Sequence, residues 1–135
     1  MILVDTSAWV EFDRATDSSV DQRLRSLIGE GGDIAVTEPV IAEVVAGART
    51  DAREARLRSL LLSFDLLPFD AAIDFDGAST IYRRCRAQGI TPRGLLDCMI
   101  AAVAVRRRVP VLSHDVDLAR IAKVVDLRLD EASTR

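Results

Sequence analysis

Residues 1–12, MILVDTSAWVEF, begin with a short aliphatic run, continue through an aspartate and pass into a helical pattern. The same order of a short aliphatic run and a longer helical segment returns along the 135-residue chain. This alternation is typical of a parallel sheet with helices on both faces, an α/β fold. The predicted strands are 2–4, 34–36, 66–69, 109–112 and a weaker 127–129. The predicted helices are 7–14, 20–28, 39–48, 52–63, 71–88, 95–107 and 116–124.

The composition is that of an ordinary globular protein, with 49% apolar and 29% charged residues. A chain of this length predicts a single domain over residues 1–135. Cys85 and Cys98 are not part of a C-x-x-C or histidine cluster that would hold zinc, so we expect free thiols in a reducing compartment. No signal peptide and no apolar run of membrane length is present, so we expect a cytoplasmic protein with no membrane partner.

The net charge of −3 and the pI near 5.1 exclude a general basic nucleic-acid coat protein. They do not exclude an enzyme that acts on nucleic acid. Of the 18 basic residues all but Lys123 are arginine, whose planar fork suits phosphate. The clusters at 83–86 and 106–108 are most simply interpreted as solvated helix ends that complement the helix dipole.

Four acidic residues converge on one edge of the predicted sheet. Asp5 follows the first strand, and Asp115 follows the fourth, with Asp117 two residues later. Glu43 lies in the opening turns of the helix after the second strand, and Asp97 begins the helix that leads back to the fourth strand. The carboxyl ends of parallel strands meet at one edge, where ligands of open α/β sheets bind. We therefore expect these carboxylates to share a site.

Asp97 stands within GLLDCMIAAVAV, residues 94–105, on a helical stripe with Gly94, Ala101 and Ala104. Such small neighbours leave room beside the carboxylate. Two carboxylates ~4 Å apart repel by about 4 kcal/mol at an effective dielectric near 20. Protonation or an arginine partner could offset this, but a hard divalent cation satisfies several carboxylates together. Because no histidine or cysteine contributes, Mg²⁺ or Mn²⁺ is favoured over zinc, and such a site suits phosphodiester hydrolysis.

Each acid also has a simpler interpretation when it is taken alone. Asp5 could cap the helix that follows it, and Asp115 could do the same, with Ser113 as a rival cap. Asp97 could be satisfied by the free N–H groups of a first helical turn, and Glu43 could lie on a solvated helix edge. None of these interpretations explains why all four residues converge.

Four segments, in this order and spacing, resemble the PIN-domain ribonucleases of the VapC toxin type over essentially the whole chain. They are MILVDTSAWVEF, TEPVIAEVVAGA, GLLDCMIAAVAV and PVLSHDVDLARIA. The resemblance implies a three-layer α/β/α PIN-like domain whose parallel sheet has four or five short strands. It also implies a Mg²⁺-dependent endoribonuclease that acts on structured RNA such as tRNA or rRNA. Such proteins are toxins of type II toxin-antitoxin modules, commonly dimeric and silenced by a VapB-type antitoxin.

The resemblance also implies a role for each residue of the site. Asp5, Asp97 and Asp115 would hold one or two metal ions, and Asp117 would adjust the second position. Glu43 would orient or deprotonate the attacking water, and the products would carry a 5′-phosphate and a 3′-hydroxyl. The implied catalytic residues are Asp5, Glu43, Asp97 and Asp115, the implied metal ligands are Asp5, Asp97, Asp115 and Asp117, and Thr6 and Ser7 support them.

Two other functions stay open at the level of sequence. The first is a phosphohydrolase in which Asp5 is the nucleophile of an aspartyl-phosphate, but no aspartate follows two residues later and Lys123 lies late in the chain. The second is a catalytically silent PIN-like module that binds RNA or a protein. The presence of all four acids counts against the silent module.

Overall fold

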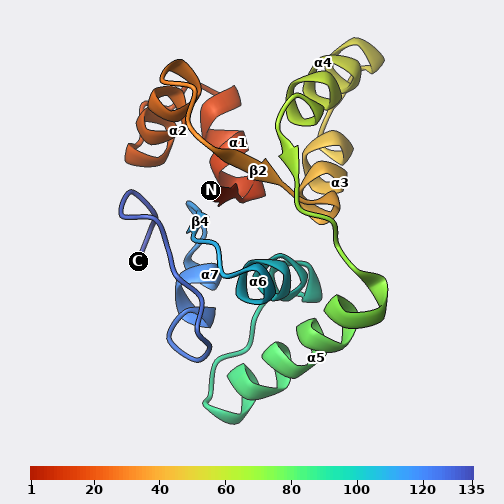
Figure 1. Ribbon diagram of the computed structural model, residues 1–135, viewed down its shortest axis with the longest axis vertical. Helices are drawn as coiled ribbons and strands as arrows, with labels where there is room; N and C mark the ends of the chain where they lie inside the picture. The colour runs from red at the N-terminus through yellow and green to blue at the C-terminus, as the bar shows by residue number, and fades with distance from the viewer.

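The computed structural model describes residues 1–135 and contains a four-stranded parallel sheet in the order β3-β2-β1-β4 (Figure 1). In register, Leu3 of β1 lies beside Ala35 of β2 on one side and Val111 of β4 on the other. The strand bounds are Ile2–Val4 for β1, Ile34–Val36 for β2, Asp65–Leu66 for β3 and Val111–Leu112 for β4. The opening aliphatic run is therefore a central strand.

Helices cover both faces of this sheet, which confirms the predicted three-layer α/β/α fold. The connections β1 to β2 and β2 to β3 run in one direction across the sheet, and the connection from β3 to β4 returns past β2 and β1. Because parallel crossovers are right-handed, α1–α4 and the pair α5–α6 are placed on opposite faces (Figure 1). The helix bounds are α1 Thr6–Asp13, α2 Ser19–Gly29, α3 Glu38–Ala46, α4 Asp51–Leu62, α5 Ala71–Ala87, α6 Leu95–Arg107 and α7 Val116–Ile121.

The predicted helices and four of the five predicted strands are present in the structure, most of them with shifted ends. The third strand ends at Leu66, since Leu67 donates one last bond to Val36 and Pro68 has no N–H to continue the ladder. The last predicted strand is reduced to a single bridge between Val111 and Leu129. The last helix ends at Ile121 instead of residue 124, because the following N–H groups turn to carbonyls three residues back.

The two central strands are short apolar runs without the alternation of a half-exposed strand. Leu3, Val4 and all three residues of β2 are buried, as expected for a sheet covered on both faces. Asp5 follows directly, and its N–H bonds to the Leu112 carbonyl oxygen at 3.0 Å. The strand thus delivers the first acid to the carboxyl edge of the sheet. No helix of the chain combines the length and the apolar character needed to cross a membrane.

The helices α5 and α6 pack along each other in opposite directions (Figure 1). Arg106 near the end of α6 pairs with Asp74 in the first turn of α5. Further along, Gly77 of α5 lies against Ala102 of α6. At the other end the buried thiols of Cys85 and Cys98 interact; both are free, as the sequence predicts. The carboxyl end of α5 is therefore level with the start of α6, where Asp97 lies.

The interpretation of Arg106 as a solvated helix end is wrong. Its Nε and Nη2 donate to Asp74 at 2.8 and 2.7 Å, and Nη2 also donates to the Pro68 carbonyl oxygen at 3.0 Å. The Asp74 side chain is 1% exposed. Burial opposes ionisation of this acid, but the Arg106 guanidinium outweighs it and holds the pKa of Asp74 below its usual range. The pair therefore joins the two helices of one layer.

Candidate active site

The sheet edge brings the predicted acids toward one another from four segments. Asp5 and Asp115 are the N-caps of α1 and α7. Asp97 is the third residue of α6, and Glu43 lies in α3. Repulsion from Asp115, Asp5 and Glu43 acts on the Asp97 carboxyl, so all four belong to one electrostatic site.

Asp5 has one satisfied oxygen and one without a partner. Its Oδ2 accepts hydrogen bonds from the Ser7 hydroxyl at 2.7 Å, the Ser7 N–H at 3.3 Å and the Ser113 hydroxyl at 3.2 Å. The residue is 2% exposed, and its Oδ1 is buried with no hydrogen-bond partner. Burial raises the pKa of Asp5 to about 6 despite the hydrogen bonds from Ser7. Capping therefore accounts for Oδ2 but not for Oδ1, which is available to a ligand.

No hydrogen-bond donor or cation of the chain offsets the negative charge of the Asp97 carboxylate. The alternative in which N–H groups of the first helical turn satisfy it is wrong, since no hydrogen bond or cation contributes to its ionisation. Burial first, and then repulsion from the neighbouring acids, raise the pKa of Asp97 to about 7. A cation beside this carboxyl would favour its ionised form at neutral pH.

Three carboxylates form a close group, in which Asp97 and Asp115 are half-buried and Asp117 is buried. One oxygen from each of Asp97, Asp115 and Asp117 lies within 4.8 Å of the others. Asp115 Oδ1 also accepts the N–H of Asp117 at 2.9 Å, so the capping interpretation of Asp115 holds for that oxygen. The other Asp115 oxygen remains free for a ligand.

Arg93 is a site residue that sequence reasoning did not assign. Its Nε donates to Asp117 Oδ2 at 2.6 Å, and its Nη2 donates to Asp115 Oδ1 at 3.0 Å. Arg120 reaches the other oxygen of Asp117 at 3.3 Å. Burial works against ionisation of Asp117, but the bonds from Arg93 outweigh it and hold the pKa of Asp117 below its usual range. The only signal in the sequence was the position of Arg93 four residues before Asp97.

Hydroxyl groups hold two of the acids in place. The Thr6 hydroxyl donates to Glu43 Oε1 at 2.6 Å. The Ser7 hydroxyl donates to Asp5 and accepts the His114 N–H at 2.8 Å, which ties α1 to the loop after β4. Thr6 and Ser7 therefore contact carboxylates directly, in the supporting position that the sequence suggested.

The donor set fits a hard divalent cation. All candidate ligands are carboxylate oxygens, and Asp5 Oδ1 and the Asp97 carboxylate have no internal partner. Mg²⁺ and Mn²⁺ prefer such oxygen ligands, whereas zinc prefers nitrogen and sulfur. Both cysteines are buried, and neither belongs to the group of side chains that could hold an ion.

The raised pKa values predict a pH-dependent stability in EDTA. The folded state holds the protons of Asp5 and Asp97 more tightly than the unfolded chain, so their contribution is greatest below the ordinary value of 3.8 and is lost as the pH rises through about 6 and 7. Between pH 5 and pH 8 the free energy of unfolding of the wild type should fall by on the order of 3 kcal/mol because of Asp97. The Asp97→Asn protein should not show this fall. Denaturant unfolding of both proteins at the two pH values measures this. An equal loss in both proteins would contradict the assignment.

Sequence comparison with known proteins identifies the family of this chain. The PIN domain family matches residues 2–124. Ribonuclease VapC11 of Mycobacterium tuberculosis is 41% identical over 129 residues, which cover 95% of this chain and 96% of that protein.

Solved structures share the fold at low sequence identity. VapBC2 from Rickettsia felis bound to a promoter DNA fragment has a TM-score of 0.75 at 18% identity and covers 100% of both chains. The Mycobacterium tuberculosis toxin VapC20, whose structure is described as cleaving the sarcin-ricin loop, has a TM-score of 0.70 at 17% identity, over 95% of this chain and 99% of that one. With the family match and the 41% identical relative, the chain belongs to the PIN-domain family, among the VapC ribonucleases.

Proposed function

We propose that the protein is a Mg²⁺-dependent endoribonuclease, with Mn²⁺ as a substitute ion, that hydrolyses phosphodiester bonds of structured RNA such as tRNA or rRNA. The observation that carries the proposal is the absence of a partner for Asp97 and for Asp5 Oδ1 in an all-carboxylate site. The names of the relatives, a VapC ribonuclease and a sarcin-ricin loop cleaving toxin, support the substrate class.

Each acid then has a part in the reaction. Asp5, Asp97 and Asp115 would hold the ion through oxygens that lack a cationic partner or retain a free position. When bound, the ion would stabilise the charge that develops on the scissile phosphate and the leaving oxygen. Glu43 is held at Oε1 by Thr6, so Oε2 is free to take a proton from the attacking water. Cleavage of the bond from phosphorus to the 3′ oxygen leaves a 5′-phosphate and a 3′-hydroxyl.

Asp117 acts through Arg93 in this proposal. Both of its oxygens accept hydrogen bonds from arginines, so it holds Arg93 beside Asp115. It also lies with Asp97 and Asp115 in the group that could hold an ion, so it stays assigned to the second metal position that the resemblance implies. The Arg93 side chain is 74% exposed and its guanidinium lies at the rim of the acidic site. It neutralises part of the negative charge that a substrate phosphate must approach.

The test is cleavage of tRNA and rRNA by the purified protein with Mg²⁺, Mn²⁺ or EDTA, followed by sequencing of the new 5′ ends. We expect discrete 5′-phosphate ends with either ion, and none with EDTA or in the Asp5→Ala protein. Arg93→Gln should keep the same sites and the same metal requirement but cleave about tenfold or more slowly, a loss within the range of electrostatic stabilisers. Cleavage that persists in EDTA would refute the metal requirement.

The same experiment distinguishes the alternatives. A silent module would bind RNA and produce no new ends. An aspartyl-phosphate enzyme would retain labelled phosphate, but its nucleophile would be Asp5, which is 2% exposed and held by Ser7 and Ser113. The chain also lacks the second aspartate two residues after Asp5 that such an enzyme would use, which favours the nuclease.

We further propose that residues 1–135 are one nuclease domain, a cytoplasmic toxin of a type II toxin-antitoxin module that forms a homodimer and is silenced by a VapB-type antitoxin. The VapBC2 neighbour supports this partner. Co-expression with the product of the adjacent gene should yield a complex without cleavage activity, and light scattering of the free protein should give twice the mass of 14.8 kDa. A monomer that the adjacent product leaves active would refute both assignments.

A further inference from the structure

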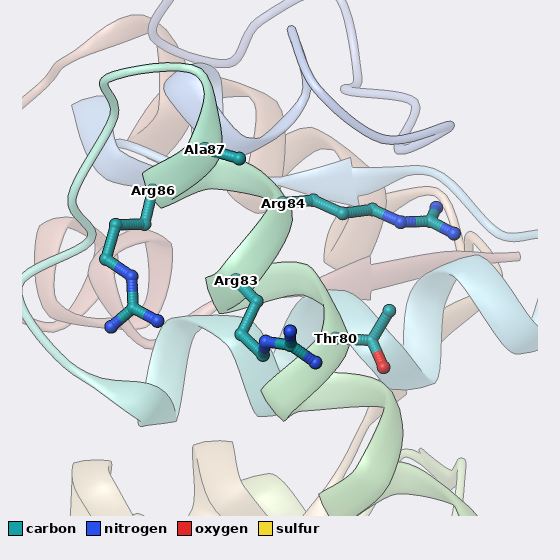
Figure 2. Close-up of a pocket in the computed structure, with 5 residues that line it drawn as sticks. All are labelled: Thr80, Arg83, Arg84, Arg86 and Ala87. Carbon is teal, nitrogen blue, oxygen red and sulfur yellow. The ribbon is translucent and has the colours of Figure 1, made fainter.

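The last turns of α5 form a basic surface that the proposed catalytic site does not use. Thr80, Arg83, Arg84 and Arg86 line a hollow there, and all four are exposed. Figure 2 shows the three guanidinium groups extending away from the helix in different directions, with the Thr80 hydroxyl one turn below Arg83 and Arg84. We call these four residues the arginine surface.

The positive charge of the arginine surface is not compensated within the chain. Residues 77–96 contain four arginines and no acidic residue, in a protein whose net charge is −3. Arg93 is paired with Asp115 and Asp117, but no salt bridge or hydrogen bond engages the other three guanidinium groups. Asp76 and Asp126 line a second hollow that Thr80 and Arg84 also border, but neither acid forms an ion pair with Arg84, so the three guanidinium groups keep their positive charge free for a ligand.

The helix packing places the arginine surface beside the acidic site. Arg84 and Arg86 flank Cys85, which is buried and within electrostatic reach of the buried Cys98, and Asp97 directly precedes Cys98. Packed helix axes lie about 8–10 Å apart. The loop that connects the two helices carries Arg93, which reaches the acids themselves. The arginine surface and Arg93 therefore lie on consecutive segments, the end of α5 and the loop that leads into α6.

Complementing the helix dipole does not account for this surface. The dipole explains cations in the last turn, where Arg84 and Arg86 lie, at about 0.3–1 kcal/mol each. It does not explain Arg83 or the absence of acids over residues 77–96. None of the three side chains bonds to the free carbonyls at the helix end. Arg86 instead lies over the Tyr82 ring, 5.8 Å from its centroid, with its donors exposed to solvent.

We propose that the arginine surface binds the phosphodiester backbone of the RNA on the segment that leads into the acidic site. This inference rests on the proposed function. A polyanion is repelled both by the net negative protein and by the carboxylates, so its approach requires a positive path. Guanidinium groups bind phosphate oxygens in pairs, and the Thr80 hydroxyl adds a donor. With only 4% aromatic residues, the chain holds RNA by its backbone and not by base stacking.

The test compares two triple variants of equal charge. Arg83→Ala/Arg84→Ala/Arg86→Ala removes the arginine surface. Arg49→Ala/Arg56→Ala/Arg107→Ala removes three exposed arginines elsewhere that also lack ion pairs. Both variants change the net charge from −3 to −6. Binding of fluorescent unfractionated tRNA is measured by anisotropy in EDTA, where cleavage does not interfere, with far-UV circular dichroism to show that each variant folds.

We expect loss of the arginine surface to weaken Kd at least about tenfold and to reduce the slope of log Kd against log salt by about 2, as three lost phosphate contacts require. The control triple should change Kd less than about twofold. Equal weakening in both variants, or an unchanged Kd in the first, overturns the proposal. So does an unchanged Kd for RNA together with weaker binding of the co-expressed antitoxin. Wild-type cleavage with Mg²⁺ is scored separately, and its failure would refute the proposed function alone.

Discussion

The Asp97→Asn variant is expected to cleave RNA about 1,000-fold more slowly than the unaltered protein at saturating Mg²⁺, because it loses a charge placed for the ion and not for the fold. Burial and four neighbouring acids oppose ionisation of Asp97, whose pKa is raised to about 7. Asparagine keeps the size of the side chain and removes the charge. The cleavage activity should therefore fall without any loss of stability, and the metal-free variant should be more stable than the wild type at pH 8.

The measurement pairs single-turnover cleavage of mapped RNA sites with thermal unfolding in EDTA. Asp76→Asn is the matched control, since Asp76 is exposed on α5 and makes no ion pair. It should retain activity within about twofold, as surface changes usually do. A folded Asp97→Asn protein with wild-type activity would remove Asp97 from the site.

The Arg106→Ala variant is expected to lower the free energy of unfolding by about 3 kcal/mol, the cost of leaving one member of a buried ion pair behind. Arg106 donates twice to Asp74 and once to the Pro68 carbonyl oxygen, and the Asp74 side chain is 1% exposed. Without the guanidinium, this carboxylate must become protonated or draw water between α5 and α6. The melting temperature should fall by about 10 °C for a domain of this size.

Arg107→Ala provides the control, because Arg107 is the next residue, is exposed and has no partner. Its effect should stay within about 0.5 kcal/mol. Thermal and urea unfolding at pH 7 compare the two variants. If both variants unfold alike, the pair contributes nothing and α5 and α6 are held by apolar packing alone.

The sequence was sufficient for the parts of the site that follow from topology. Asp5 and Asp115 follow the ends of strands. Because the carboxyl ends of parallel strands lie at the same edge of a sheet, the two acids were expected to lie together there. Asp97 could be placed because the helix that carries it must run back before the fourth strand. The strand and helix order was predictable for the same reason, since short buried runs and longer helical patterns differ in period.

The arginine partners could not be predicted, because they depend on how separate elements dock. Arg93, on the loop before α6, reaches Asp117 across a separation of 24 residues, and Arg106 meets Asp74 across a separation of 32 residues. Both arginines lie in segments whose local pattern equally suits a solvated charge. The lack of a hydrogen-bond partner for Asp5 Oδ1 could not be predicted from the sequence either, because it depends on the positions of Ser7 and Ser113 around the other oxygen.

The central place of β1 has a consequence for biosynthesis. Asp5 bonds to Ser113, a residue 108 positions later, and Leu3 pairs with Val111. Contacts so distant along the chain cannot form until Val111 and Ser113 have left the ribosome. If the acids perform the proposed cleavage, a nascent or prematurely terminated chain cannot yet damage the translation machinery that is making it.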